Sequence, residues 1–228
     1  FRSRGEKMSK SVGNVIDPFT MADAYGVDQM RYFFLREVPF GQDGNYSHEG
    51  IVGRINADLA NDLGNLAQRS LSMINKNCDG KTPAPGAFTA ADEAMLAGAE
   101  AMLGAARGAM KDFLLHTVLA DIWKVVADAN RYFAGEEPWK LTKTDPARRD
   151  TVLYVTAETL RLIGLLAQPF IPGAAGKLLD LLAVPASARS FAQANAAHRL
   201  TPGAPLPAPA PIFPRYVEAE EGQGKGVR

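Results

Sequence analysis

The longest helical pattern in the sequence runs through residues 47–77, and it constrains the fold more than any other feature. Its apolar side chains recur every three or four positions, a spacing that places them on one face of a helix. These side chains are Ile51, Ile55, Leu59, Leu63, Leu66 and Met73. Because such a face must be covered by other apolar surfaces, this stretch predicts a helix packed among further helices.

Similar patterns recur along the chain. They predict helices over residues 18–25, 29–38, 89–110, 114–133, 146–168 and 174–184. Three starts carry their own signals: Pro18 directly after Asp17, a capping box made by Thr89 and Asp92, and Asp28 as the cap of the second helix.

No segment keeps the alternation of a β-strand. Four or five long amphipathic helices with short connections therefore predict an all-α protein built as an antiparallel bundle. We expect Met95, Met102 and Met110 to lie in its core.

The composition excludes several classes of protein. Of the 228 residues, 46% are hydrophobic and 25 basic residues balance 25 acidic ones, which argues against disorder and against a general DNA-coating protein. The single cysteine, Cys78, excludes an internal disulfide and a cysteine-based zinc site in this chain. No apolar run reaches the roughly 18 residues of a membrane span, and we expect no signal peptide. We expect a cytoplasmic protein.

The stretch GEKMSKSVGNVIDP, residues 5–18, holds two lysines and two serines close together. Lys7 and Lys10 are flexible point charges, and Ser9 and Ser11 add hydroxyl donors. Such a loop suits a polyphosphate, whose negative charge it can approach and stabilise during a reaction. By residue types alone, a solvated surface loop explains the pattern as well.

A second candidate site lies in GNLAQR, where Asn65 and Arg69 are four residues apart. On a helix they project from one face and can reach the same nucleotide. Each can read a base edge by hydrogen bonding, and proteins read RNA sequence mainly in single-stranded loops. Ordinary solvated helix residues are the alternative explanation.

The string KMSKS and the later stretches GNVIDP, YGVDQMRYFFLRE and FGQDGNYS are similar to the class I aminoacyl-tRNA synthetases, and to methionyl-tRNA synthetases in particular. The resemblance covers residues 5–183. It implies activation of methionine by ATP, with Mg²⁺, to methionyl-adenylate, followed by transfer to a methionine tRNA.

The resemblance also assigns roles to residues. It implies that Lys10, assisted by Lys7, stabilises the charge on the pyrophosphate side, and that the ATP-binding loop consists of Lys7, Met8, Ser9, Lys10 and Ser11. It implies a CAU anticodon read by Asn65, Arg69 and Trp139, with Pro138 beside the tryptophan. An exposed indole is a platform on which a base can stack. Asn130, Arg131 and Tyr132 are weaker candidates for supporting that surface.

From the resemblance we expect three parts. Residues 1–46 are the end of a Rossmann-type catalytic domain with the loop and its connector, residues 47–185 are the α-helical anticodon-binding domain, and residues 186–228 are a proline-rich tail. In the tail we expect Ile212 and Phe213 to anchor an extended strap, and the end from Glu218 to be mobile.

The first residue is Phe1 rather than methionine, and the methionine pocket of the family lies upstream of the loop. We therefore expect the chain to be inactive by itself. Some family members carry an additional C-terminal dimerising domain; we expect none here, and hence a monomer. Whether a preceding half binds zinc does not follow from this sequence. Two alternatives remain open: a cysteine, isoleucine or valine synthetase, and a non-catalytic helical module that binds RNA or another protein.

Overall fold

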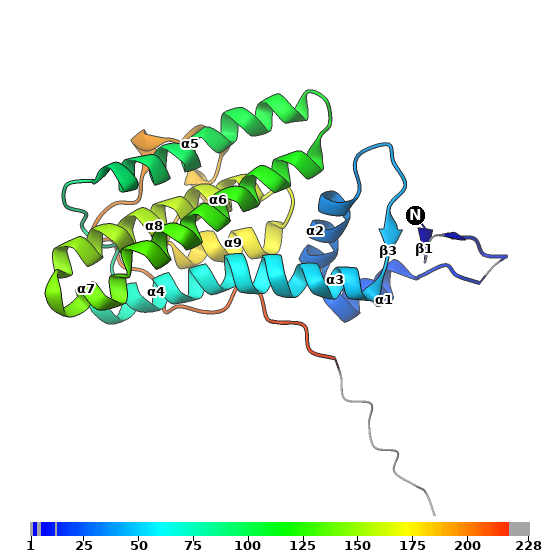
Figure 1. The fold of residues 1–228 in the computed structure, drawn as a ribbon, viewed down its shortest axis with the longest axis horizontal. Helices are drawn as coiled ribbons and strands as arrows, with labels where there is room; N and C mark the ends of the chain where they lie inside the picture. Colours follow the sequence, from blue (N-terminus) through cyan, green and yellow to red (C-terminus); the bar gives the residue numbers. More distant parts are fainter. Residues whose placement is uncertain (1, 4–5, 12, 219–228) are drawn as a thin grey trace, which may run out of the picture.

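The computed structural model describes residues 2–3, 6–11 and 13–218. Its helices form a bundle with a smaller α/β part at one end (Figure 1). The main helices are α1 (Pro18–Tyr25), α2 (Val27–Glu37), α3 (His48–Arg54), η1 (Ile55–Gly64), α4 (Asn65–Asn77), α5 (Ala90–Met110), α6 (Leu115–Glu136), α7 (Pro138–Thr144), α8 (Pro146–Ala167) and α9 (Pro172–Leu181). The expectation of a helical bundle is confirmed.

Three strands of two residues each were not expected. They are β1 (Arg2–Ser3), β2 (Glu6–Lys7) and β3 (Asn45–Tyr46). They form a sheet in the order β2-β1-β3, with β1 antiparallel to β2 and parallel to β3. Strands this short leave no alternating pattern for sequence inspection to find.

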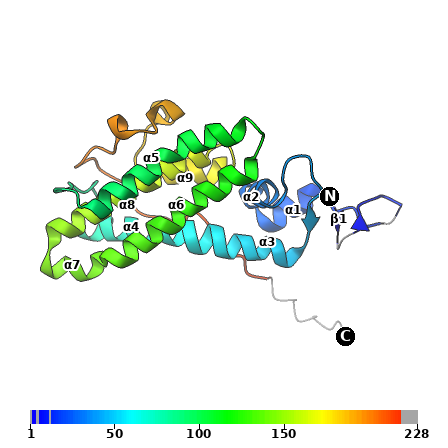
Figure 2. The same cartoon turned by 45° about the horizontal axis from the view of Figure 1, so that its top comes forward.

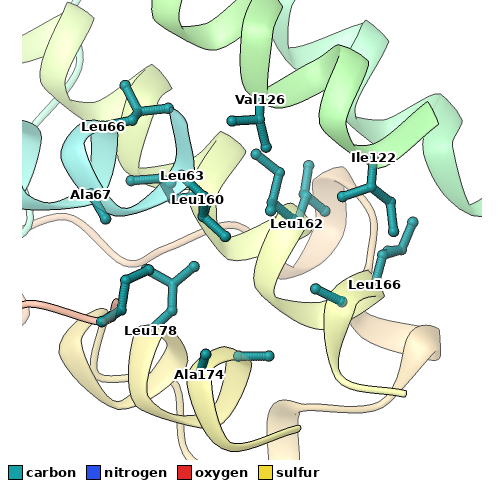
Figure 3. Packing of buried hydrophobic residues seen from close by; sticks show 14 of the residues in the cluster. Leu63, Leu66, Ala67, Ile122, Val126, Leu160, Leu162, Leu166, Ala174 and Leu178 are labelled. Atoms are coloured by element: carbon teal, nitrogen blue, oxygen red, sulfur yellow. The ribbon is translucent and has the colours of Figure 1, made fainter. Parts of the chain in front are cut away.

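Helix α8 is the centre of the bundle. Every residue from Thr151 to Ala167 is buried, so the helix is covered on all sides rather than along one stripe. Figure 3 shows its Leu160, Leu162 and Leu166 beside leucines of η1 and α4, aliphatic residues of α6, and α9. At Gly164 an added Cβ would lie 3.0 Å from Leu179 Cδ2, so the missing side chain permits the close approach of α9.

A charged pair lies inside this core. Arg161 Nη2 is 2.6 Å from Glu158 Oε1, and both side chains are almost fully buried. Arg161 also donates to the carbonyls of Gln193 and Asn195, while Glu158 accepts from the Leu200 amide. Since buried charges are costly unless they are fully paired, this pair fixes the segment that contains these three residues onto α8.

The expected helix over residues 47–77 is continuous, but its middle is a π-helix, η1. Two side chains of α6 donate to carbonyls of this wider turn: Trp123 Nε1 to Asp58 at 3.0 Å, and Asn130 Nδ2 to Asp62 at 3.1 Å. π-Helical turns are rare and depend on such surroundings. A periodicity of apolar residues does not distinguish them from α-helix.

The smaller part docks on the bundle through α2. The expectation that Asp28 caps its own helix is wrong, because the N-cap residue of α2 is Gly26. The Asp28 carboxylate instead accepts a hydrogen bond from the Ala174 amide at the start of α9. Arg31 donates to the carbonyls of Pro169 and Phe170 at 2.6 and 2.9 Å. A capping rule considers only neighbouring residues, so it cannot predict that Asp28 pairs with Ala174, 146 residues away.

Other helix predictions differ in detail. Helix α6 continues through Glu136, beyond the expected end, and α7 was not expected as a separate helix. Met95 and Met102 are buried as expected, but Met110 is 41% exposed, so its assignment to the core was wrong. It lies at the last turn of α5, where that helix extends past the core.

The tail begins with three short 3-10 helices, η2 (Ala186–Ala188), η3 (Phe191–Gln193) and η4 (Ala196–His198). Residues 205–214 then pack as an extended strap in which Ile212 and Phe213 are buried, as expected. Tyr216 exchanges two hydrogen bonds with the side chain of Asn56 on η1. Residues 219–228, part of the end that we expect to be mobile, lie outside the described residues. None of the described helices is long and apolar enough to cross a membrane.

The capping box of α5 is confirmed and belongs to a larger network. Asp92 accepts from the Thr89 amide, from Tyr132 Oη on α6 and from two nitrogens of Arg148 on α8. Burial raises the pKa of the Asp92 carboxyl, but these hydrogen bonds outweigh it and hold the pKa at about 2. The network thus joins three helices through one ionised carboxylate.

Asp92→Asn should lower the free energy of unfolding at pH 7 by roughly 1–3 kcal/mol, because it removes a buried ionised acceptor from the partly buried Arg148. The folded pKa lies below the roughly 3.9 of an unfolded aspartate. The stabilisation by this carboxylate is therefore complete above about pH 4 and is lost as the pH falls towards 2. Denaturant unfolding at pH 7 and between pH 4 and 2 measures both effects.

Glu93→Gln, at the next and exposed position, is the matched control and should change little. If Asp92→Asn kept both the stability and the acid profile of the parent, the network would not be a source of stability.

Candidate nucleic-acid interface and phosphate loop

Three side chains from three helices stack at the α7 end of the bundle. The Arg69 guanidinium carbon lies 5.2 Å from the ring centroid of Phe133 and 5.4 Å from that of Trp139. The two ring centroids are 6.0 Å apart. A guanidinium over aromatic faces is attracted by their electron-rich surfaces. The structure therefore brings Arg69 and Trp139 together, as the sequence analysis expected of one reading surface.

The side chains of this group differ in their exposure to solvent. Phe133 is buried, whereas Trp139 keeps 42% of its surface exposed. Asn65 and Arg69 are both exposed on the same face of α4. The group thus offers an indole surface, an amide and a guanidinium to solvent, which are the groups that stack on and hydrogen-bond to an unpaired base.

The corner between α6 and α7 places Trp139. Glu137 has φ +47°, in the left-handed region, and turns the chain sharply. Pro138 follows at the first position of α7, where its missing N–H is not needed, and it is buried. Pro138 therefore supports the corner from beneath, and Trp139 projects from it.

The three weaker candidates next to this corner have different surroundings. Asn130 donates to the Asp62 carbonyl and so supports η1 just before Asn65. Arg131 is exposed and pairs with Asp128 on its own helix. Tyr132 donates to Asp92 on α5, so its hydroxyl belongs to the structural network.

The candidate phosphate loop, which contains Lys7, Met8, Ser9, Lys10 and Ser11, lies at the opposite end of the molecule, beside β1 (Figures 1 and 2). Lys7, Lys10 and Ser11 are exposed, and Met8 and Ser9 are half-buried. In the part of the chain that is described, neither lysine has an acidic partner. The Ser9 and Ser11 hydroxyl oxygens are 2.9 Å apart. Gly5 and Val12 lie outside the described residues.

Asn14 organises this loop, a role that the sequence analysis did not assign. Its Oδ1 accepts from the Ser9 amide at 2.8 Å, and its Nδ2 donates to the Lys7 carbonyl at 3.2 Å. Gly13 has φ +72°, a conformation that favours glycine. Asparagine side chains commonly hold turns in this way, so the sequence GN was a usable signal.

Two family models match the chain. One, described as tRNA synthetases class I (M), matches residues 1–71, and the other, described as the anticodon binding domain of methionyl tRNA ligase, matches residues 82–224. The chain belongs to the methionyl-tRNA ligase family.

Relatives in this family agree over nearly the whole chain. The methionine–tRNA ligase of Brucella suis biovar 1 (strain 1330) is 68% identical over 219 residues, which cover 96% of this chain and 42% of that protein. That of Mycobacterium tuberculosis (strain ATCC 25618 / H37Rv) is 55% identical over 98% of this chain and 43% of that protein. The chain thus spans about two fifths of the length of these relatives.

Solved structures give the same result. The Mycobacterium tuberculosis methionyl-tRNA synthetase in complex with methionyl-adenylate matches with a TM-score of 0.89 at 56% identity, over 93% of this chain and 42% of that one. The apo form of that synthetase matches with a TM-score of 0.87 at 53% identity, over 90% of this chain and 42% of that one.

In this member of the methionyl-tRNA ligase family, Phe133 belongs to the candidate site although its sequence context did not single it out. Its ring lies under Arg69, yet in sequence it is one of many apolar residues at helical spacing. No signal in the pattern distinguishes it from ordinary core. Among the described residues, no group of three or more His, Cys, Asp or Glu side chains could hold a metal ion.

Asn14→Ala should speed hydrogen exchange of the Ser9 amide by roughly tenfold, because it removes the acceptor of that N–H and a net hydrogen bond contributes about 1 kcal/mol. Exchange measured by NMR tests this. Ser11→Ala, which removes only a hydroxyl contact of Ser9, is the control and should leave the amide unchanged. Equal exchange in parent and Asn14→Ala would show that Asn14 does not hold the loop.

Proposed function

We propose that this chain works within a methionine–tRNA ligase, where it contributes the ATP-stabilising loop and the surface that reads the tRNA anticodon. The observation that carries the proposal is the stack of Arg69 on Phe133 and Trp139 with Asn65 one turn away. It presents stacking and hydrogen-bonding groups together. Family membership supports the assignment to methionine over cysteine, isoleucine or valine.

In the first step, a carboxylate oxygen of methionine attacks the α-phosphorus of ATP. The bond from this phosphorus to the oxygen that bridges it to the β-phosphorus breaks, and pyrophosphate leaves. Lys10 pairs with the negative charge that grows on the leaving group, and Lys7 assists from β2. Both side chains are exposed on a loop that Asn14 holds, so they can reach a triphosphate.

Met8, Ser9 and Ser11 shape the loop, and Met8 lines an apolar cavity with Ile16 and Met21. Mg²⁺, when bound to the nucleotide, neutralises phosphate charge; we assign it no ligand among the described residues. In the second step, a hydroxyl of the terminal adenosine of the tRNA attacks the acyl carbon, and AMP leaves.

The anticodon surface acts through recognition rather than chemistry. Trp139 supplies a face for an unstacked base, and Asn65 and Arg69 supply hydrogen bonds to base edges of a CAU anticodon. Arg69 is oriented by the two rings beneath it, so less conformational freedom is lost when it binds. Non-catalytic RNA binding by this chain alone is the second candidate, favoured by the same exposed group.

The division into residues 1–46, 47–185 and 186–228, a monomeric state and a cytoplasmic location are part of this proposal. So is the inactivity of the chain by itself in methionine activation, because the methionine pocket is expected elsewhere in the ligase.

Lys10→Ala in the ligase should slow adenylate formation roughly 100-fold, about 3 kcal/mol, while methionine affinity stays nearly unchanged. The reason is that the ammonium interacts with charge that develops in the transition state. Pre-steady-state adenylation measures the rate, and Lys76→Ala, an exposed lysine on α4, is the control. An unchanged rate would contradict the role of Lys10.

Trp139→Ala should weaken charging of methionine tRNA by about 1–3 kcal/mol, the range for base stacking on an aromatic side chain. Adenylate formation should not change, because the loop is at the other end of the molecule. Arg69→Ala should also relax the preference for CAU. Charging of parent and anticodon-altered tRNA separates the two effects.

Phe191→Ala removes an aromatic side chain of similar exposure on another surface and serves as the control. If Trp139→Ala and Arg69→Ala charged both tRNAs as the parent does, the anticodon surface would lie elsewhere. The second candidate, non-catalytic RNA binding, would be favoured if the parent ligase did not charge methionine tRNA while the isolated chain still bound that RNA.

A further inference from the structure

A cavity of about 630 Å³ lies away from both proposed sites, where the end of the α5–α6 hairpin meets α2 and the end of α8. Figures 1 and 2 both show this end of the hairpin beside α2. The lining is mostly apolar. Its apolar members include Leu103, Ala106, Met110, Leu115, Val118 and Leu166.

The polar members of the lining all carry positive charge: Arg31, Arg107 and Lys111. No acidic residue belongs to the lining, and Asp112, which follows Lys111, is not part of it. Within the described residues, neither Arg107 nor Lys111 has an ion-pair partner. The positive charges of Arg107 and Lys111 therefore lie beside an apolar cavity whose lining contains no carboxylate to pair with them.

The arrangement follows from the helix geometry of α5. Leu103, Ala106, Arg107, Met110 and Lys111 are spaced by three and four residues, so one face of the last turns presents apolar stems and two charges together. Cations near a helix C-terminus also interact favourably with the helix dipole. That effect accounts for the charges but not for the exposed apolar surface, where Met110 keeps 41% of its own surface exposed.

Arg31 completes the rim. Two of its guanidinium nitrogens donate to the carbonyls of Pro169 and Phe170, which fixes the group in place. Its Nη1 makes no hydrogen bond to any described residue. A fixed guanidinium with an unused donor is a ready partner for a carboxylate.

We propose that this cavity binds a small organic acid, with its apolar body against α5, α6 and α8 and its carboxylate beside Arg107 and Lys111. The volume lies within the roughly 300–1,000 Å³ of small-molecule sites, which are typically apolar with a few placed charges. A polynucleotide would bring many phosphates to a lining that is mostly apolar. The inference does not depend on the proposed function.

Sodium decanoate is the probe. Titration calorimetry of the 228-residue chain should show saturable binding at one site, and the methyl resonance of Met110 should shift with the same dissociation constant. Decyltrimethylammonium, with the same tail and opposite charge, should bind at least about tenfold more weakly, because its head meets three cations.

The variants locate the site. Arg107→Gln with Lys111→Gln should weaken decanoate at least about tenfold, since both charge partners are lost. Ala106→Trp should fill the cavity and abolish binding, and Ala106→Leu is a smaller filling variant if the first does not fold. Lys76→Gln removes an exposed lysine elsewhere and should have no effect.

The proposal is overturned by any of three results. They are binding of decanoate without saturation, equal binding of the two amphiphiles, and decanoate affinity unchanged in the folded Arg107→Gln, Lys111→Gln variant. A fourth result would also overturn the proposal: loss of decanoate binding in the whole ligase, which would mean that another part of the protein covers the cavity.

Discussion

Helix α8 lies at the centre of the bundle, with α4, α5, α6, α7 and α9 packed around it. Since no side of this helix reaches solvent between Thr151 and Ala167, each neighbour must present an apolar face to it. The same burial makes Glu158 and Arg161 costly unless all of their hydrogen-bonding groups are satisfied. The chain around residues 193–200 satisfies them, so the central helix determines the position of the tail as well as of the bundle.

The hydrogen bonds of α2 connect the phosphate loop to this bundle. Asp28 and Arg31 reach the turn between α8 and α9, and Tyr32 donates to Asp58 on η1 at 2.8 Å. Helix α4 continues directly from η1 and carries Asn65 and Arg69. The two candidate sites therefore lie at opposite ends of one chain of packed elements. The Arg69 stack is built from residues far apart in sequence, whereas Asn14 holds the loop from close by in sequence.

Some expectations were accurate because their cause is local. The helix over residues 47–77, the capping box of Thr89 and Asp92, and the helix that begins at Pro146 all follow from neighbouring residues. Others failed because a distant element decided them. Asp28 accepts from the Ala174 amide of α9 instead of capping α2, and the Phe133 ring lies beside Arg69 in the candidate site although its sequence context is that of a core residue.

The sequence by itself determined that the chain is helical, where most helices begin, and, through KMSKS and its neighbouring stretches, which family to expect. These properties depend on backbone propensity, apolar spacing and short motifs. Tertiary structure alone decided the π-helical turn of η1, the exposure of Met110, the charged pair inside the core and the stack of Arg69 on two rings. Each of these requires side chains that meet only after folding, so its free energy depends on packing and desolvation that no local pattern encodes.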